Sequence, residues 1–138
     1  MTVGMAHLSR RTNIVNLKTT TRQVDGIAVV DVSGRIILGE ETKLLRETIQ
    51  HLIGAGQNDI ILNLGEVSFI DSAGIGELVS AFTSVRNRGG DMKLLRLTRR
   101  VHDVLQITKL YTVFDIKDDE AAAIKSFHMR KNIAGSVA

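Results

Sequence analysis

The sequence predicts an α/β domain whose mixed, mainly parallel sheet has four to five strands, an antiparallel hairpin at its N-terminal edge and about four packed helices. Two observations lead to this fold class. Two β-branched segments come first, and helical and strand-like segments then alternate, which is the order that builds a parallel sheet with crossover helices. The length of 138 residues suits one domain. We expect the domain to span residues 18–128, between a flexible N-terminal extension at 1–17 and a flexible C-terminal tail at 129–138.

The domain opens with a predicted β-hairpin. Residues 19–24 and 27–33 are rich in β-branched side chains and flank Asp25 and Gly26. This dipeptide supplies the positive φ angles that a two-residue hairpin turn requires. We therefore expect two antiparallel strands, the second of which ends at Gly34.

A helix and a buried strand are expected next. Residues 39–56 have helical spacing, and Gly54 and Gly56 mark the end of the helix. Residues 60–64 form a short apolar run, which is typical of a strand covered on both faces. The positions that define the helical face are Leu44, Leu45, Thr48, Ile49, Leu52 and Ile53.

The same alternation continues to the C-terminal end of the domain. The strand-like residues 67–70 precede a second helix, which begins at Ser72 and ends at Gly89 and Gly90. A strand at 92–97, a helix at 99–108 and a short strand at 113–116 follow. Residues 118–128 form the fourth helix, which acidic residues open at its positive dipole end. The apolar stripe of the second helix consists of Ile75, Leu78, Val79, Phe82 and Val85.

The charge distribution argues against direct nucleic-acid binding. Residues 1–24 hold four basic residues and no acidic one, and the rest of the chain holds 14 basic and 15 acidic residues. A nucleic-acid-binding domain concentrates positive charge on its folded surface, with aromatic residues for stacking. One local cluster has three interpretations, in decreasing order of preference: solvated surface, docking patch for an acidic protein, and nucleic-acid site. It consists of Arg86, Arg88, Lys93, Arg96, Arg99 and Arg100, with Asp91 among them.

The sequence carries no signature of an enzyme. It has no cysteine, no GxxxxGK phosphate loop and no GxSxG elbow. None of its four histidines lies at metal-ligand spacing from another histidine or an acid. We therefore expect no catalysis, no metal and no cofactor. No apolar stretch is long enough for a membrane span and no signal peptide is evident, so we expect a cytoplasmic location.

Ser72 is the residue whose position and side chain are best suited to a chemical modification. It lies between a strand-like segment and an amphipathic helix, where its hydroxyl could cap the helix by accepting a backbone hydrogen bond. Such a junction is also a place where an added phosphate would meet the positive end of a helix dipole. The small residues Ala73, Gly74 and Gly76 leave the first turn open to a partner. Considered by themselves, the residues favour the cap over the phosphate acceptor.

The chain closely resembles the STAS domains, specifically the bacterial anti-anti-sigma factors, at a segment that reads DSAGIGEL from Asp71 to Leu78. The resemblance also includes VSGRI at 32–36, GGDMKLL at 89–95 and LQITKLYTVFDI at 105–116. It therefore covers about residues 18–128.

The resemblance implies an anti-sigma factor antagonist that works by partner switching. In this family, the serine after the aspartate is phosphorylated by a GHKL-type anti-sigma factor kinase, and a PP2C-type phosphatase reverses the reaction. The unphosphorylated form binds the anti-sigma factor and frees the sigma factor. Ser72 takes that role by resemblance, in a protein expected to be a monomer or weak dimer. The implied partner-binding residues are Asp71, Ser72, Ala73, Gly74, Ile75, Gly76, Glu40 and Glu41.

One position departs from the family pattern. Many members have an aspartate where this chain has Ile37, and Glu40 or Glu41 could replace it. Two other functions stay open at this point. The chain could be a STAS subunit of a membrane transport complex, or a STAS scaffold that is not phosphorylated.

Overall fold

The fold class predicted from the sequence is confirmed. The computed structural model describes the backbone of residues 14–137 and the side chains of residues 14–129. One five-stranded sheet has the order β1-β2-β3-β4-β5, in which β1 is antiparallel to β2 and every other neighbouring pair is parallel. The strands are β1 (Leu17–Val24), β2 (Ile27–Ile36), β3 (Asp59–Ile70), β4 (Asp91–Leu95) and β5 (Asp115–Lys117).

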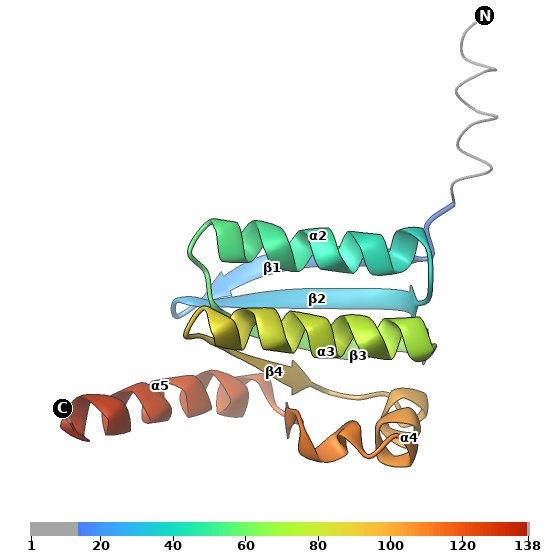
Figure 1. Cartoon of the computed structure of the whole chain (residues 1–138). Coiled ribbons are helices and arrows are strands. Elements are labelled where there is room, and N and C mark those ends of the chain that lie inside the picture. The colour runs from blue at the N-terminus through green and yellow to red at the C-terminus, as the bar shows by residue number, and fades with distance from the viewer. Residues whose placement is uncertain (1–13, 138) are drawn as a thin grey trace, which may run out of the picture.

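Three helices connect successive strands, a fourth follows the last strand, and together these helices of the described residues cover both faces of the sheet. They are α2 (Glu40–Gly54), α3 (Ser72–Asn87), α4 (Arg99–Ile107) and α5 (Glu120–Val137), with a short 3₁₀ turn η1 (Leu110–Thr112). Figure 1 shows α2 and α3 side by side in front of the strands. The main core lies on that face, where α2, α3 and α4 pack, and a smaller core lies under α5 on the other face.

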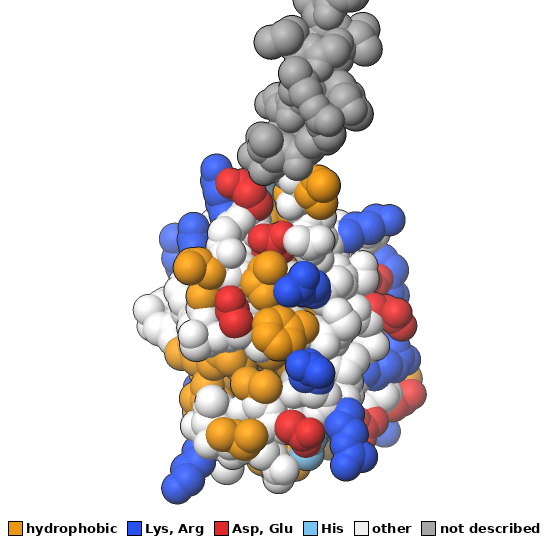
Figure 2. Space-filling model, turned by 90° about the vertical axis from the view of Figure 1, so that its right-hand side faces the viewer, with side chains coloured by type: hydrophobic (Ala, Val, Ile, Leu, Met, Phe, Trp, Pro, Cys, Tyr) orange, Lys and Arg blue, Asp and Glu red, His pale blue; other side chains and the backbone are white. Residues whose placement is uncertain are grey.

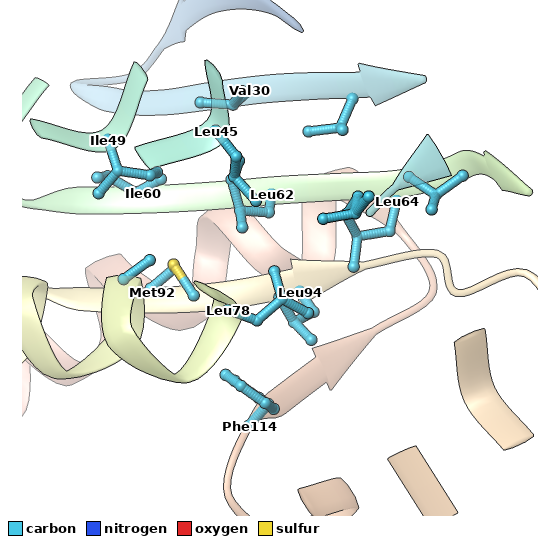
Figure 3. Close-up of a cluster of buried hydrophobic side chains, with 14 of the residues drawn as sticks. Val30, Leu45, Ile49, Ile60, Leu62, Leu64, Leu78, Met92, Leu94 and Phe114 are labelled. Carbon is cyan, nitrogen blue, oxygen red and sulfur yellow. The ribbon is translucent and has the colours of Figure 1, made fainter. Parts of the chain in front are cut away.

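The main core consists of interdigitating aliphatic side chains from both layers. Figure 3 shows Val30, Ile60 and Leu62 of the sheet together with Leu45 of α2 and Leu78 of α3. All five are fully buried. Burying a side chain of this size contributes about 1.5–3 kcal/mol. The apolar positions of the strands and those of the helices therefore form one common core.

The predicted hairpin is present with the expected turn. Asp25 and Gly26 have φ angles of 51° and 81°, and the residues on either side, Val24 and Ile27, pair directly. The second strand, however, does not end at Gly34. It continues to Ile36, and at Gly34 (φ 112°) the carbonyl of Asn16 approaches so closely that a Cβ atom would overlap it. Gly34 thus serves a close backbone approach rather than a strand end.

Several element boundaries also differ from the prediction. The runs 60–64 and 67–70 belong to one strand, β3, because β2 stays paired with it through two register shifts. The last strand starts at Asp115, two residues later than expected. The expected end of the last helix at His128 is wrong, since α5 continues to Val137. The predicted N-terminal extension is described only from residue 14, and Leu17 already belongs to β1.

Candidate functional site

Asp71, rather than Ser72, is the N-cap of α3. Its backbone is extended (φ −102°, ψ −176°), and its Oδ1 accepts a hydrogen bond from the N–H of Gly74 at 2.8 Å. Its Oδ2 accepts a second one from the N–H of Leu38 at 3.0 Å. One carboxylate therefore caps α3 and ties the loop between β2 and α2 to it. The interpretation of Ser72 as the cap is wrong.

The hydrogen bonds of Asp71 also keep its carboxylate charged. Partial burial would by itself raise the pKa of Asp71, but the backbone N–H groups of Leu38, Gly74 and Ala73 outweigh it and lower the pKa below its ordinary value. The start of α3 consequently carries a fixed negative charge directly beside Ser72.

Ser72 is the first residue of α3 and is exposed. Its hydroxyl has no hydrogen-bond partner within the described part of the chain. A hydroxyl in this position is accessible to a partner or a modifying enzyme, and the first turn of the helix offers a favourable dipole to an added anion.

The two glycines after Ser72 have opposite environments. Gly74 is buried, and a Cβ atom there would overlap the carbonyl oxygen of Ile36 and lie 2.7 Å from Cγ1 of Ile70. The expectation that Gly74 keeps the surface open to a partner is therefore wrong, because its missing side chain would point into the core. Gly76 is exposed, and a Cβ atom there would have nothing within 4 Å. Gly76 is therefore the glycine whose missing side chain leaves the outer surface of the helix uncovered.

The remaining predicted site residues divide between surface and interior. Ala73 is half-buried, and Ile75 is in the core with 7% of its surface exposed. Glu40 is exposed at the start of α2. Glu41 is buried, and its Oε2 accepts hydrogen bonds from the backbone N–H of Asn16 at 2.7 Å and from its Nδ2 at 3.2 Å.

Glu41 acts inside the fold. The hydrogen bond from the backbone of Asn16 lowers the pKa of Glu41 despite its burial, and the nearby charge of Arg35 adds to this effect. The charged carboxylate holds the start of β1 against α2, where Arg35 also donates its backbone N–H to the carbonyl of Asn16 at 2.8 Å. Of the two glutamates, only Glu40 has a free position on the surface.

Leu38 is a site residue that the sequence analysis missed. Its side chain is 76% exposed, and its backbone N–H is bound to Asp71. An apolar residue between the strand and the helix could have been noticed, but residue spacing does not show that this loop lies against the start of α3. Leu38 gives the surface around Ser72 an apolar contact point.

The basic cluster noted in the sequence does not form one patch. Arg86 lies 3.5 Å from Asp91, and Lys93 is buried between Asp91 and Asp115, 2.5 Å from the latter. Arg100 lies on α4 and contacts neither of these acids. The structure therefore separates structural ion pairs from surface arginines.

The described residues contain no candidate metal site and no candidate membrane-spanning helix. No group of three or more histidine or acidic side chains among them is placed to hold a metal ion. Within the same part of the chain, none of the helices has the length and apolar character needed to cross a membrane.

The chain is similar to known proteins over most of its length. The family model of the STAS domain matches residues 18–123. The anti-sigma-B factor antagonist of Bacillus subtilis is 31% identical over 102 residues, which are 74% of this chain and 92% of that protein.

Solved structures show the same fold. A putative anti-sigma factor antagonist from Thermotoga maritima aligns with a TM-score of 0.71 and 24% identity, over 80% of this chain and 94% of that one. The anti-sigma factor antagonist SpoIIAA in its unphosphorylated form aligns with a TM-score of 0.68 and 23% identity, over 79% and 95% of the two chains. SpoIIAA in its phosphorylated form aligns with a TM-score of 0.63 and 22% identity, over 79% and 98%.

The family model begins one residue into β1 and covers the other four strands and the helices that join the strands, including the Asp71–Ser72 junction at the start of α3. This chain belongs to the STAS domain family.

Proposed function

We propose that this protein is an anti-sigma factor antagonist controlled by phosphorylation of Ser72. The unphosphorylated form binds an anti-sigma factor of the GHKL kinase type, which then releases its sigma factor. Phosphorylation of Ser72 by that kinase ends the binding, and a PP2C-type phosphatase restores it. The chain itself has no catalytic role in this cycle.

The observation that carries the proposal is that Asp71 caps α3 while Ser72 stays exposed. Because Asp71 caps α3, the hydroxyl of Ser72 is exposed and bonded to no described residue. A phosphate on this hydroxyl would break no hydrogen bond that the fold needs. The relatives support the role, since the protein that is 31% identical is named an anti-sigma-B factor antagonist. The fold also accommodates phosphorylation, because SpoIIAA shares it in both forms.

The charges at the start of α3 explain how phosphorylation would dissociate a complex without unfolding the domain. Phosphorylation adds about −1.5 to −2 charges at neutral pH. The positive end of the α3 dipole tolerates this charge inside the chain. A partner surface that fits the neutral hydroxyl beside the charged Asp71 instead meets two adjacent negative groups, which oppose binding.

Intact-mass spectrometry tests the proposal directly. The protein is incubated with ATP and a candidate GHKL-type kinase from its own genome, together with Ser72→Ala and the control Ser68→Ala. Ser68 is also exposed, at the end of β3, and donates a hydrogen bond to the carbonyl of Gly34. We expect one added phosphate in the wild type and in Ser68→Ala, and none in Ser72→Ala.

Binding to the same kinase completes the test. Unphosphorylated protein should form a complex in native mass spectrometry, and the phosphorylated protein should not. Phosphate uptake by Ser72→Ala, or a complex that survives phosphorylation, would refute the switch. A stable complex without any phosphate transfer would instead support the unphosphorylated scaffold.

A further inference from the structure

Three side chains from distant parts of the sequence meet at the end of the sheet where α3 begins. The ring of Phe69 on β3 is half-buried. The guanidinium carbon of Arg35 on β2 lies 5.7 Å from the ring centroid, and that of Arg100 on α4 lies 5.4 Å from it. We call these residues the Arg–Phe–Arg cluster. Both arginines are exposed to solvent.

Neither charge of this cluster is neutralised by an ion pair within the described residues, although Arg35 lies near enough to the buried carboxylate of Glu41 to lower its pKa. The ring is the group that each guanidinium contacts. Arg100 also lies in the first turn of α4, where the helix dipole disfavours a cation. Two like charges thus lie against one ring, and the dipole of α4 disfavours one of them, although the ring attracts both.

The cluster adjoins the surface around Ser72. Arg35 pairs with Phe69 in the sheet, and the next pair along the two strands leads directly to Asp71. Figure 2 views this end of the molecule and shows hydrophobic side chains gathered there, with both basic and acidic side chains between and beside them. Exposed Leu38 lies in the loop that follows β2. A partner that covers Ser72 and Leu38 is therefore within reach of both arginines.

We propose that the Arg–Phe–Arg cluster binds an acidic segment of the protein partner that docks at Ser72, an inference that rests on the proposed function. Charge complementarity identifies the segment, because two exposed guanidinium groups that form no ion pair within the described residues match a segment rich in carboxylates. A nucleic acid fits less well, since the one aromatic ring is already occupied by guanidinium groups instead of being free to stack on a base. The cluster would speed association and fix the orientation of the partner.

The first experiment measures binding of the same candidate GHKL-type kinase by surface plasmon resonance at low and high salt. The variant Arg35→Gln/Arg100→Gln is compared with Arg88→Gln/Lys125→Gln, which removes two exposed charges, one from the C-cap of α3 and one from α5. We expect the cluster variant to lose about 3- to 10-fold in association rate at low salt, with a smaller loss at high salt. The control variant should stay within about twofold of the wild type.

The second experiment needs no kinase, so it separates this inference from the proposed function. Octaglutamate is titrated into ¹⁵N-labelled full-length protein, with a single-stranded oligonucleotide of equal charge as the comparison. We expect the peptide to shift the side-chain Nε–H signals of Arg35 and Arg100 more than the oligonucleotide does. The cluster variant should lose the accompanying backbone shifts around Phe69.

The outcomes decide between the two ideas. If octaglutamate binds at the cluster but the kinase does not bind the protein, the proposed function fails and the acidic-segment site stands. If the kinase binds the cluster variant as fast as the control variant, the proposed function stands and the cluster has no docking role. If octaglutamate leaves the arginine signals unmoved, or the oligonucleotide binds there more strongly, the inference is overturned.

Discussion

The packing of α3 on the sheet depends on Gly74, and alanine substitutions at Gly74 and Gly76 test this dependence. Both residues lie in the first two turns of α3. In a helix, alanine is favoured over glycine by about 0.8–1 kcal/mol. Helix propensity alone therefore predicts that both substitutions stabilise the protein.

The structure predicts opposite signs. At Gly74, a Cβ atom overlaps the carbonyl oxygen of Ile36 and lies 2.9 Å from Cγ2 of that residue and 2.7 Å from Ile70. Relieving such overpacking costs about 1–3 kcal/mol, and the upper part of this range applies because a backbone atom must move. After the propensity gain, Gly74→Ala should lose about 1–2 kcal/mol. Gly76→Ala meets open space and should gain about 0.4–1 kcal/mol.

Urea unfolding followed by circular dichroism measures both effects. With a slope of about 2 kcal/mol per molar urea, Gly74→Ala should lower the midpoint by roughly 0.5–1 M, and Gly76→Ala should raise it by roughly 0.2–0.5 M. Equal shifts in the two variants, or a raised midpoint for Gly74→Ala, would show that α3 does not pack this closely on β2.

Two further predictions concern the carboxylates near the site. Asp71→Asn should lose about 1–2 kcal/mol at pH 7, because the cap loses its charge and one of its two acceptor oxygens. Since folding lowers the pKa of Asp71, its contribution is fully present above the unfolded value of about 3.9 and is lost as the pH falls through the folded pKa. Acid titrations of stability should therefore be less steep for the variant than for the wild type, and equal slopes would contradict this role. Glu41→Ala should accelerate hydrogen exchange at the amide of Asn16 at least tenfold, whereas the exposed Glu40→Ala should leave it unchanged. A protected Asn16 amide in Glu41→Ala would show that another group holds the start of β1.

The elements that the sequence predicted correctly are those that local chemistry determines. The turn at Asp25 and Gly26 could be predicted because it needs two adjacent positive φ angles, which this dipeptide readily adopts. The four helices and five strands of the described residues follow from apolar spacing or from short apolar runs, because each element has to bury one face or one stripe. Apolar content alone indicates two segments, 60–64 and 67–70, but they belong to one strand, β3, that runs through Gly65 and Glu66. Pairing with β2 across a register shift keeps the strand continuous there.

The sequence by itself determined the fold class and the family, and it singled out the Asp71–Ser72 junction as the candidate site. Only the tertiary structure decided what the residues of that junction do. Whether the capping carboxylate of Asp71 also holds the loop before α2 depends on the position of the Leu38 amide, and the role of Gly74 depends on its distance from Ile36. The lowered pKa of the buried Glu41 likewise depends on a hydrogen bond from Asn16, 25 residues away. These are contacts between segments that lie apart in the chain, and residue spacing encodes the face a side chain occupies but not the partner it meets there.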